Sequence, residues 1–214
     1  MSAIGRATGT LFIVSAPSGA GKTSLVRALT ERDPLLRISV SHTTRARREG
    51  EVDGDHYHFV DGATFQRMIG AGEFLEHAQV FGNHYGTSRA AVQAELDAGR
   101  DVILEIDWQG ARQVRSHMPG CVGVFVLPPS LAMLRQRLES RAQDDPGTIE
   151  RRMNAAVEEL RHHDEYDFLV VNDRFEQALA ELSAVVLSQR LRAAAQIPRL
   201  ASLTAELLAA KPTD

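Results

Sequence analysis

The sequence predicts an α/β fold in which helices flank a parallel sheet and a phosphate-binding loop follows the first strand. Apolar runs rich in β-branched residues alternate with amphipathic helical patterns, which is typical of a doubly wound sheet. The first run leads directly into a glycine-rich loop that ends at Lys22, where a helical pattern begins. Residues 41–87 interrupt the alternation and are too many for an ordinary connection in a compact domain. We therefore expect an inserted mixed α/β subdomain within the core.

Four apolar runs are predicted to be strands buried on both faces, as in a parallel sheet. They lie at residues 11–15, 102–106, 122–127 and 168–171, and residues 38–41 are predicted to add an edge strand. Helical patterns lie at residues 24–32, 89–98, 111–118, 131–143 and 148–166. Because strands and helices alternate along the chain, the predicted sheet is parallel and covered by helices.

The chain is predicted to form one large domain and a helical tail. The domain spans residues 8–192, with a core at 8–40, 88–134 and 153–192, an insert at 41–87 and a lid at 135–152; the tail spans residues 193–214. The lid segment is dense in arginines and acids around Asp144-Asp145-Pro146-Gly147, so we expect a helix, a polar turn and a second helix. Leucines after Pro198 form a short amphipathic stripe, expected to pack on the core, with a partner helix as the alternative; a homo-oligomer is left open.

Composition excludes several classes of function. The chain has 214 residues and a formal net charge of −4, so nothing favours bulk attraction to nucleic acid or to an anionic membrane. A single cysteine, Cys121, excludes an internal disulfide and fits a reducing compartment. No apolar stretch reaches the length of a membrane span, and the N-terminal residues do not resemble a secretory signal. We expect a cytoplasmic protein whose partners include neither nucleic acid nor a membrane.

The glycine-rich loop follows the pattern G-x-x-x-x-G-K-[ST] of phosphate-binding loops, with alanine at the first position. It comprises Ala16, Pro17, Ser18, Gly19, Ala20, Gly21, Lys22 and Thr23. Lys22 is one of only two lysines in the chain, and its compact ammonium can follow the β- and γ-phosphates better than a wider, planar guanidinium. Thr23 has its hydroxyl where a Mg²⁺ ligand is needed. A glycine-rich turn without function is the alternative, and the order of strand, loop and helix favours phosphate binding.

Further polar residues are candidates for binding, and each has a simpler alternative. The strand predicted at 102–106 is followed by Asp107, an acid that could organise Mg²⁺, its waters or the substrate. The segment from Ser41 to Arg48 combines hydroxyls and arginines that suit a highly charged oxyanion, although a solvated loop is an equal alternative. Tyr57 and Tyr85 could donate hydroxyls to a phosphate, or could form a minor core of the insert.

Glu76 and two histidines are harder to interpret from position alone. Glu76 lies in a partly apolar run, but lone acids are usually solvated. His56 and His58 have the spacing of residues on one face of a strand and could face one metal ion. No cysteine or second acidic pair completes such a site, so we do not expect a metal there.

Together these motifs resemble those of bacterial guanylate kinases, a family of nucleoside monophosphate kinases. The matching stretches are residues 14–24 (VSAPSGAGKTS), 39–48 (SVSHTTRARR), 50–57 (GEVDGDHY), 74–88 (FLEHAQVFGNHYGTS), 104–111 (LEIDWQGA) and 170–173 (VVND). They occur in family order, which makes the resemblance far more specific than the phosphate-binding loop alone.

The resemblance implies a role for each matching residue. The residues that would hold the phosphate of GMP are Ser41, Arg45, Arg48, Tyr57 and Tyr85. Glu76 would read the guanine edge, assisted by Thr87 and Asp107. The residues expected to be catalytic are Lys22 and Arg45, together with the lid arginines Arg137, Arg141 and Arg152. Asn172 would lie near the base of ATP, and Ala142 stands where glycine is common, which would stiffen the lid.

The implied reaction transfers a phosphoryl group from ATP to GMP, and to dGMP, with Mg²⁺, giving ADP and GDP. Such a transfer needs alignment and neutralisation of charge more than covalent help from the protein. One alternative is another kinase on the same scaffold, acting on a different nucleotide or on a sugar phosphate such as ribose bisphosphate. The other is a non-catalytic guanylate-kinase-like binding module. The guanine-reading positions argue against the first, and the retained Lys22 and Thr23 argue against the second.

Overall fold

The computed structural model describes residues 8–80, 82–140 and 146–209. Its main sheet has five strands in the order β2-β7-β1-β8-β9, and every pairing is parallel. The strands are β1 (Leu11–Ser15), β2 (Leu36–Ile38), β7 (Asp101–Glu105), β8 (Val122–Leu127) and β9 (Phe168–Val171). The predicted fold class, a parallel sheet flanked by helices with a mixed insert, is confirmed.

Alternate residues of the central strand β1 divide the core into two layers. Phe12 and Val14 pack with the helices α1 (Lys22–Arg32) and α7 (Phe175–Arg190) on one face of the sheet. Leu11 and Ile13 pack with α3 (Arg89–Asp97) and α4 (Trp108–His117) on the other face. All five residues of β1 are buried, because successive side chains of a strand point to opposite faces and helices cover both.

Three predictions about the edges of the sheet and the helix ends were wrong. Leu169 and Val171 of β9 are 49% and 46% exposed, because this strand lies at the sheet edge and only one of its faces is covered. The edge strand expected at residues 38–41 is β2, which ends at Ile38. Helix α4 begins three residues earlier than predicted, because the carboxylate of Asp107 accepts a hydrogen bond from the amide of Gly110 and caps the helix.

The insert contains a second sheet, with strands in the order β4-β3-β6-β5. Its strands are β3 (His42–Thr43), β4 (His58–Phe59), β5 (Phe74–Val80) and β6 (Asn83–Ser88), and it also contains one helix, α2 (Gly62–Gly70). Phe65 and Met68 of α2 pack against Phe74 and form a small core of their own. The insert is therefore a packed unit, and β5 and β6 are its longest strands.

Two helices form a hairpin that lies against the phosphate-binding loop. They are α5 (Leu131–Glu139) and α6 (Pro146–Leu160), and they share a small apolar cluster that includes Leu134, Leu138 and Met153. A Cβ on Gly19 would lie 3.0 Å from Leu134 Cδ1, so the hairpin packs closely on the loop. Both helices are shorter than predicted: α5 is capped at Ser140, and α6 stops before a separate 3-10 helix at His163–Glu165.

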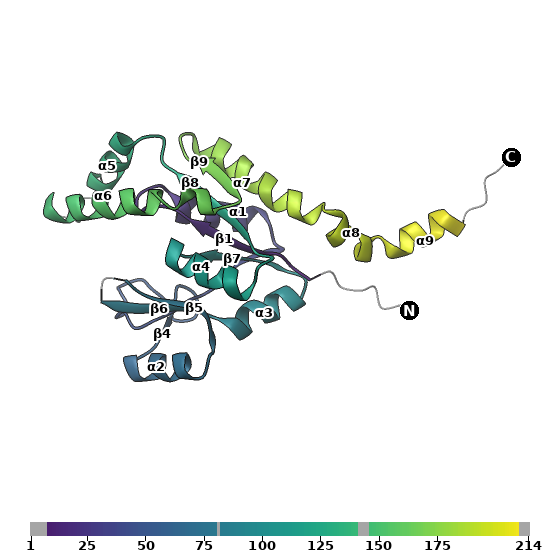
Figure 1. The fold of residues 1–214 in the computed structure, drawn as a ribbon, viewed down its shortest axis with the longest axis horizontal. Helices are drawn as coiled ribbons and strands as arrows, with labels where there is room; N and C mark the ends of the chain where they lie inside the picture. The colour runs from purple at the N-terminus through teal and green to yellow at the C-terminus, as the bar shows by residue number, and fades with distance from the viewer. Residues whose placement is uncertain (1–7, 81, 141–145, 210–214) are drawn as a thin grey trace.

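The C-terminal helices leave the core, and the expectation that their leucines pack on it was wrong. Helices α8 (Ala193–Arg199) and α9 (Ala201–Ala209) extend away from the domain, on the side opposite the insert and the α5–α6 hairpin (Figure 1). Leu203, Leu207 and Leu208 are 50%, 65% and 88% exposed. Within the described part of the chain, no helix combines the length and the apolar character needed to cross a membrane.

A half-buried arginine that sequence reasoning missed ties the end of α7 to the sheet. Arg190 donates from Nε to Asp101 Oδ2 and from Nη1 to Asp33 Oδ2, at 2.6 Å each. The other oxygen of Asp101 accepts the backbone N–H of Thr10 at 2.6 Å. The network fixes the start of β1 relative to β7, and so fixes the strand that leads into the phosphate-binding loop.

Candidate active site

The phosphate-binding loop has the backbone that its glycines allow. Gly19 and Gly21 have φ of 93° and 92°, a region in which residues with a side chain are strained. A Cβ on Gly21 would also lie 2.3 Å from Nδ2 of Asn172. The loop opens on a cavity of about 280 Å³ at the carboxyl ends of β1 and β7. Ligands of open parallel sheets bind at this edge, and the N-terminus of α1 adds positive potential there.

The cavity holds one ammonium and three carboxyl groups. Lys22 lines it with Glu105 and Asp107 from the end of β7 and with Glu159 from α6. Burial lowers the pKa of Lys22, and the negative charges of Glu105, Glu159 and Asp107 oppose that shift. Glu159 was not among the predicted site residues, because nothing in a charged helical segment distinguishes it from its neighbour Glu158.

The residues around Thr23 suit a divalent cation that is bound mainly through phosphates. Thr23 Oγ1 donates to Glu105 Oε2 at 2.9 Å, which leaves the lone pairs of the hydroxyl oxygen for a cation. Among the described residues, no group of three His, Cys, Asp or Glu side chains could hold a metal ion alone. Mg²⁺ usually keeps several waters and binds through one or two protein groups plus substrate phosphates, so the site fits this ion.

Asn172 and Arg137 brace the loop and border a second cavity. Asn172 is buried and donates from Nδ2 to the carbonyl of Ala20 at 2.7 Å. Arg137 donates to the backbone oxygens of Ala20 and Asn172, at 3.4 Å and 3.0 Å. Both residues line a cavity of about 330 Å³ beside the loop, together with Phe175. Of the other two lid arginines, Arg152 lies half-buried on α6 and Arg141 falls outside the described residues.

The carboxyl group of Glu76 is buried between the insert and the core. Glu76 on β5 pairs with Thr87 on β6, and Thr87 Oγ1 donates to Glu76 Oε1 at 2.6 Å. Burial raises the pKa of Glu76 to about 7, the hydrogen bond from Thr87 opposes the rise, and the charge of Asp107 adds to it. In the ligand-free protein this raised pKa leaves the carboxyl group partly protonated at neutral pH.

Helix α4 contacts β5 at Glu76 and at the following residue, His77, and sequence reasoning missed both contacts. A Cβ on Gly110 would lie 2.9 Å from Glu76 Oε2, so only glycine lets the helix approach the carboxyl group so closely. The amide of Gln113 clamps β5, since its oxygen accepts His77 N–H at 3.1 Å and its nitrogen donates to His77 O at 2.9 Å. Asp107 caps the same helix, so its carboxylate orients α4 as well as facing the cavity.

The insert also gathers the residues predicted to hold an acceptor phosphate. The Arg45 side chain is 13% exposed and donates from Nη2 to Glu51 Oε1 at 2.6 Å. Its guanidinium lies 5.4 Å from the centroid of the Tyr57 ring, whose neighbour Tyr85 lies edge-on at 5.9 Å. The backbone N–H of Arg48 donates to Glu51 Oε2 at 2.8 Å, and Glu51, which was not predicted, has its pKa lowered to about 2 by these bonds. Ser41 lies half-buried just before β3.

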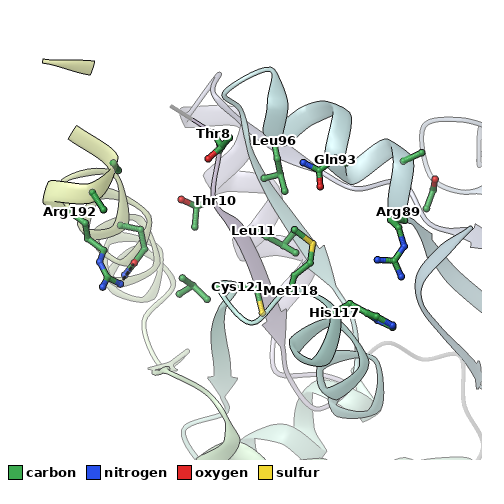
Figure 2. Close-up of a pocket in the computed structure, with 18 of the residues that line it drawn as sticks. Thr8, Thr10, Leu11, Arg89, Gln93, Leu96, His117, Met118, Cys121 and Arg192 are labelled. Carbon is green, nitrogen blue, oxygen red and sulfur yellow. Dashed lines mark hydrogen bonds between the residues drawn. The ribbon is translucent and has the colours of Figure 1, made fainter. Parts of the chain in front are cut away.

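A larger cavity, of about 1220 Å³, lies at the opposite edge of the sheet and is separate from this site (Figure 2). Figure 2 shows Leu11, Cys121 and Met118 at its floor, near the starts of β1 and β8, with Arg192 across from them. Burial raises the pKa of the Cys121 thiol, which disfavours the reactive thiolate. The cavity lies away from Lys22 and Glu76, so it takes no part in the chemistry of the phosphate-binding loop.

A parallel sheet with a phosphate-binding loop, a pair of helices packed on that loop and an inserted second sheet is typical of P-loop nucleotide kinases. Residues 8–189 match the guanylate kinase family. The guanylate kinase of Alkalilimnicola ehrlichii is 61% identical over 200 residues, which cover 94% of this chain and 98% of that protein. That of Chromohalobacter salexigens is 61% identical over 202 residues, which cover 94% of this chain and 92% of that protein. The crystal structure of guanylate kinase from Anaplasma phagocytophilum superposes with a TM-score of 0.75 at 31% identity, over 98% of both chains. The chain belongs to the guanylate kinase family.

Proposed function

We propose that this protein catalyses phosphoryl transfer from ATP to GMP, and also to dGMP, and that Mg²⁺ accompanies ATP. The observation that carries the proposal is the arrangement of two sites at one edge of the molecule. The 280 Å³ cavity with Lys22 suits the donor phosphates, and the buried pair of Glu76 and Thr87 suits a base with two adjacent donors. Guanine offers such donors on one edge, N1–H and the N2 amino group.

Within this proposal the phosphate-binding loop, the insert and the lid each have one role. Residues 16–23 bind the donor phosphates, Thr23 is a ligand of Mg²⁺, and Asn172 and Arg137 support the loop from behind. The insert, residues 41–87, binds GMP through Ser41, Arg45, Arg48, Tyr57, Glu76, Tyr85 and Thr87, with Asp107 from the core. The lid, residues 135–152, brings Arg137, Arg141 and Arg152 to the phosphoryl group that is being transferred. Mg²⁺ neutralises charge on the phosphates when it is bound.

The fold suggests how these tasks are coupled. Arginines from three segments must converge on phosphates that repel one another, so closure of the insert and lid is expected only with both nucleotides bound. Closure also excludes water, which would otherwise compete with GMP for the phosphoryl group. The proposal also includes a cytoplasmic location, the absence of nucleic acid partners and a homo-oligomer. Self-association is the first of these three to test, because the leucines of α9 are exposed.

The experiment is a coupled assay of ADP release over all nucleoside monophosphates, with and without Mg²⁺. GMP and dGMP are expected to be used and AMP to be poor. Lys22→Ala is expected to abolish turnover, and Lys22→Arg to be severely impaired, because the wider guanidinium does not fit the ammonium position. Lys211→Arg, at the only other lysine of the chain, is the matched control. Comparable turnover with AMP, or near-normal kcat for Lys22→Arg, would contradict the assignment.

A further inference from the structure

Glu159 lines the 280 Å³ cavity that also contains Lys22, here called the donor cavity, but it has no role in the proposed mechanism. It enters from α6, whereas Lys22, Glu105 and Asp107 come from the loop and the sheet. It is half-buried, and its carboxylate makes no hydrogen bond to any residue that the structure describes. Among the residues that the structure describes, Glu159 therefore neither caps a helix nor forms a structural ion pair. Its effect must come from its charge on the other groups in the cavity.

That charge is unfavourable for a bare polyphosphate. The cavity already holds two acids that have structural partners: Glu105 accepts from Thr23, and Asp107 caps α4. Adding Glu159 gives three carboxyl groups against the single ammonium of Lys22. Burial raises the pKa of Glu159 to about 7, Lys22 opposes the rise, and Asp107 adds to it, so the cavity is already short of positive charge.

We propose that Glu159 is a specificity-determining residue of the donor site, which disfavours metal-free nucleotide and thereby selects the complex with a divalent cation. The inference rests on the proposed assignment of this cavity to the phosphates of ATP. The physical reason is repulsion: a carboxylate beside the phosphates opposes a bare polyanion, and a bound cation offsets part of that repulsion. Glu159 also competes with the phosphates for the ammonium of Lys22, which strengthens the same preference.

The structure provides a matched pair of acids for the test. Glu159 and Glu158 are adjacent on α6, but the Glu158 side chain is 60% exposed and pairs with Arg161 outside the cavity. Glu159→Gln removes the charge and keeps the shape, and Glu158→Gln does the same on the solvent face. The probe is ADP, because it carries the donor phosphates and does not turn over alone. Its affinity is measured by titration calorimetry at about pH 8, above the pKa of Glu159, with excess Mg²⁺ or with EDTA.

Glu159→Gln is expected to bind metal-free ADP on the order of tenfold more tightly than the wild type, the size of effect for removing one like charge from a partly screened cavity that binds phosphates. Its affinity for Mg²⁺–ADP is expected to change less than about threefold, so the preference for the metal complex shrinks. Glu158→Gln is expected to match the wild type in both titrations. Glu159→Asp keeps the charge, so its affinities for both forms of ADP should stay close to those of the wild type. If the glutamate had a purely structural role, shortening its side chain would be expected to change these affinities.

Two outcomes overturn the inference: metal-free ADP binding equally to Glu159→Gln and wild type, or gaining as much affinity in Glu158→Gln. If Glu159→Gln does not unfold cooperatively on heating, Glu159→Ala, a second neutral variant, replaces it in both titrations. Failure of the proposed function would look different. If the wild type bound ADP neither with Mg²⁺ nor with EDTA, the assignment of this cavity to the phosphates of ATP would be wrong, whereas a wild type that binds ADP but does not differ from Glu159→Gln would contradict only this inference.

Discussion

Replacing Glu76 with glutamine is expected to change how the stability of the ligand-free protein depends on pH. Glu76 is 4% exposed, and burial raises the pKa of its carboxyl group from an ordinary value of 4.5 to about 7. In the unfolded chain the group ionises near its ordinary value, so between these two pH values the folded state holds a proton that the unfolded state has lost. The stability of the wild type therefore falls as pH rises through this window.

The size of the effect follows from the shift. At about 1.36 kcal/mol per pKa unit, a rise from 4.5 to about 7 corresponds to about 3 kcal/mol, most of which falls between about pH 5 and about pH 8. Glutamine keeps the shape and the acceptor for Thr87 but cannot ionise. Relative to the wild type, Glu76→Gln should therefore gain roughly 2 to 3 kcal/mol of stability as pH is raised across this range. Any constant cost of the amide cancels when the two pH values are compared.

The assay is urea unfolding of both proteins, without nucleotide, at about pH 5 and about pH 8. Glu73→Gln is the control, because Glu73 lies three residues earlier and is exposed, so its replacement removes no buried charge. Glu159, on α6, also titrates between these pH values, but it is present in every variant, so its contribution to the difference in stability cancels. If the difference between wild type and Glu76→Gln is the same at both pH values, the carboxyl group is hydrated in solution and the argument from burial is wrong.

Three further predictions follow from the same structure. Binding of GMP at about pH 6 should release close to one proton from Glu76, since the two guanine donors require an ionised acceptor. Calorimetry in two buffers of different ionisation enthalpy measures the number of protons released on binding. The wild type should release more protons than Glu76→Gln, in which position 76 cannot titrate. Gly21→Ala should lose ADP affinity at least about tenfold, because φ is 92° there and the new methyl group would collide with Asn172 at 2.3 Å; unchanged affinity would show that the loop relaxes. Arg190→Ala should destabilise the protein by about 3 kcal/mol, because it leaves Asp33 and Asp101 without their partner, whereas Arg27→Ala, in an exposed pair with Glu31, should cost less than about 0.5 kcal/mol in urea unfolding.

Local patterns in the sequence were sufficient to predict the architecture and the phosphate-binding loop. Strand β1, the loop and helix α1 are consecutive, so hydrophobic periodicity and glycine spacing describe them without knowledge of distant contacts. Element ends were less predictable, because they depend on single contacts. The capping of α4 by Asp107 and the end of α5 at Ser140 shifted the predicted boundaries by three residues or more.

The chemical state of the site was decided by tertiary structure. A glutamate at position 76 looks the same in the sequence whether it is solvated or buried; the close approach of Gly110 and the hydrogen bond of Thr87 determine its pKa. Asn172 is still predicted to lie near the base of ATP, and only the tertiary structure shows that it also braces a loop carbonyl 152 residues earlier in the chain. In the sequence Glu159 cannot be distinguished from Glu158. Only the structure shows that Glu159 lines the cavity with Lys22, whereas Glu158 is exposed and pairs with Arg161. Periodicity and turn chemistry are local and can be read along the chain, whereas desolvation and charge coupling depend on which distant side chains surround a group.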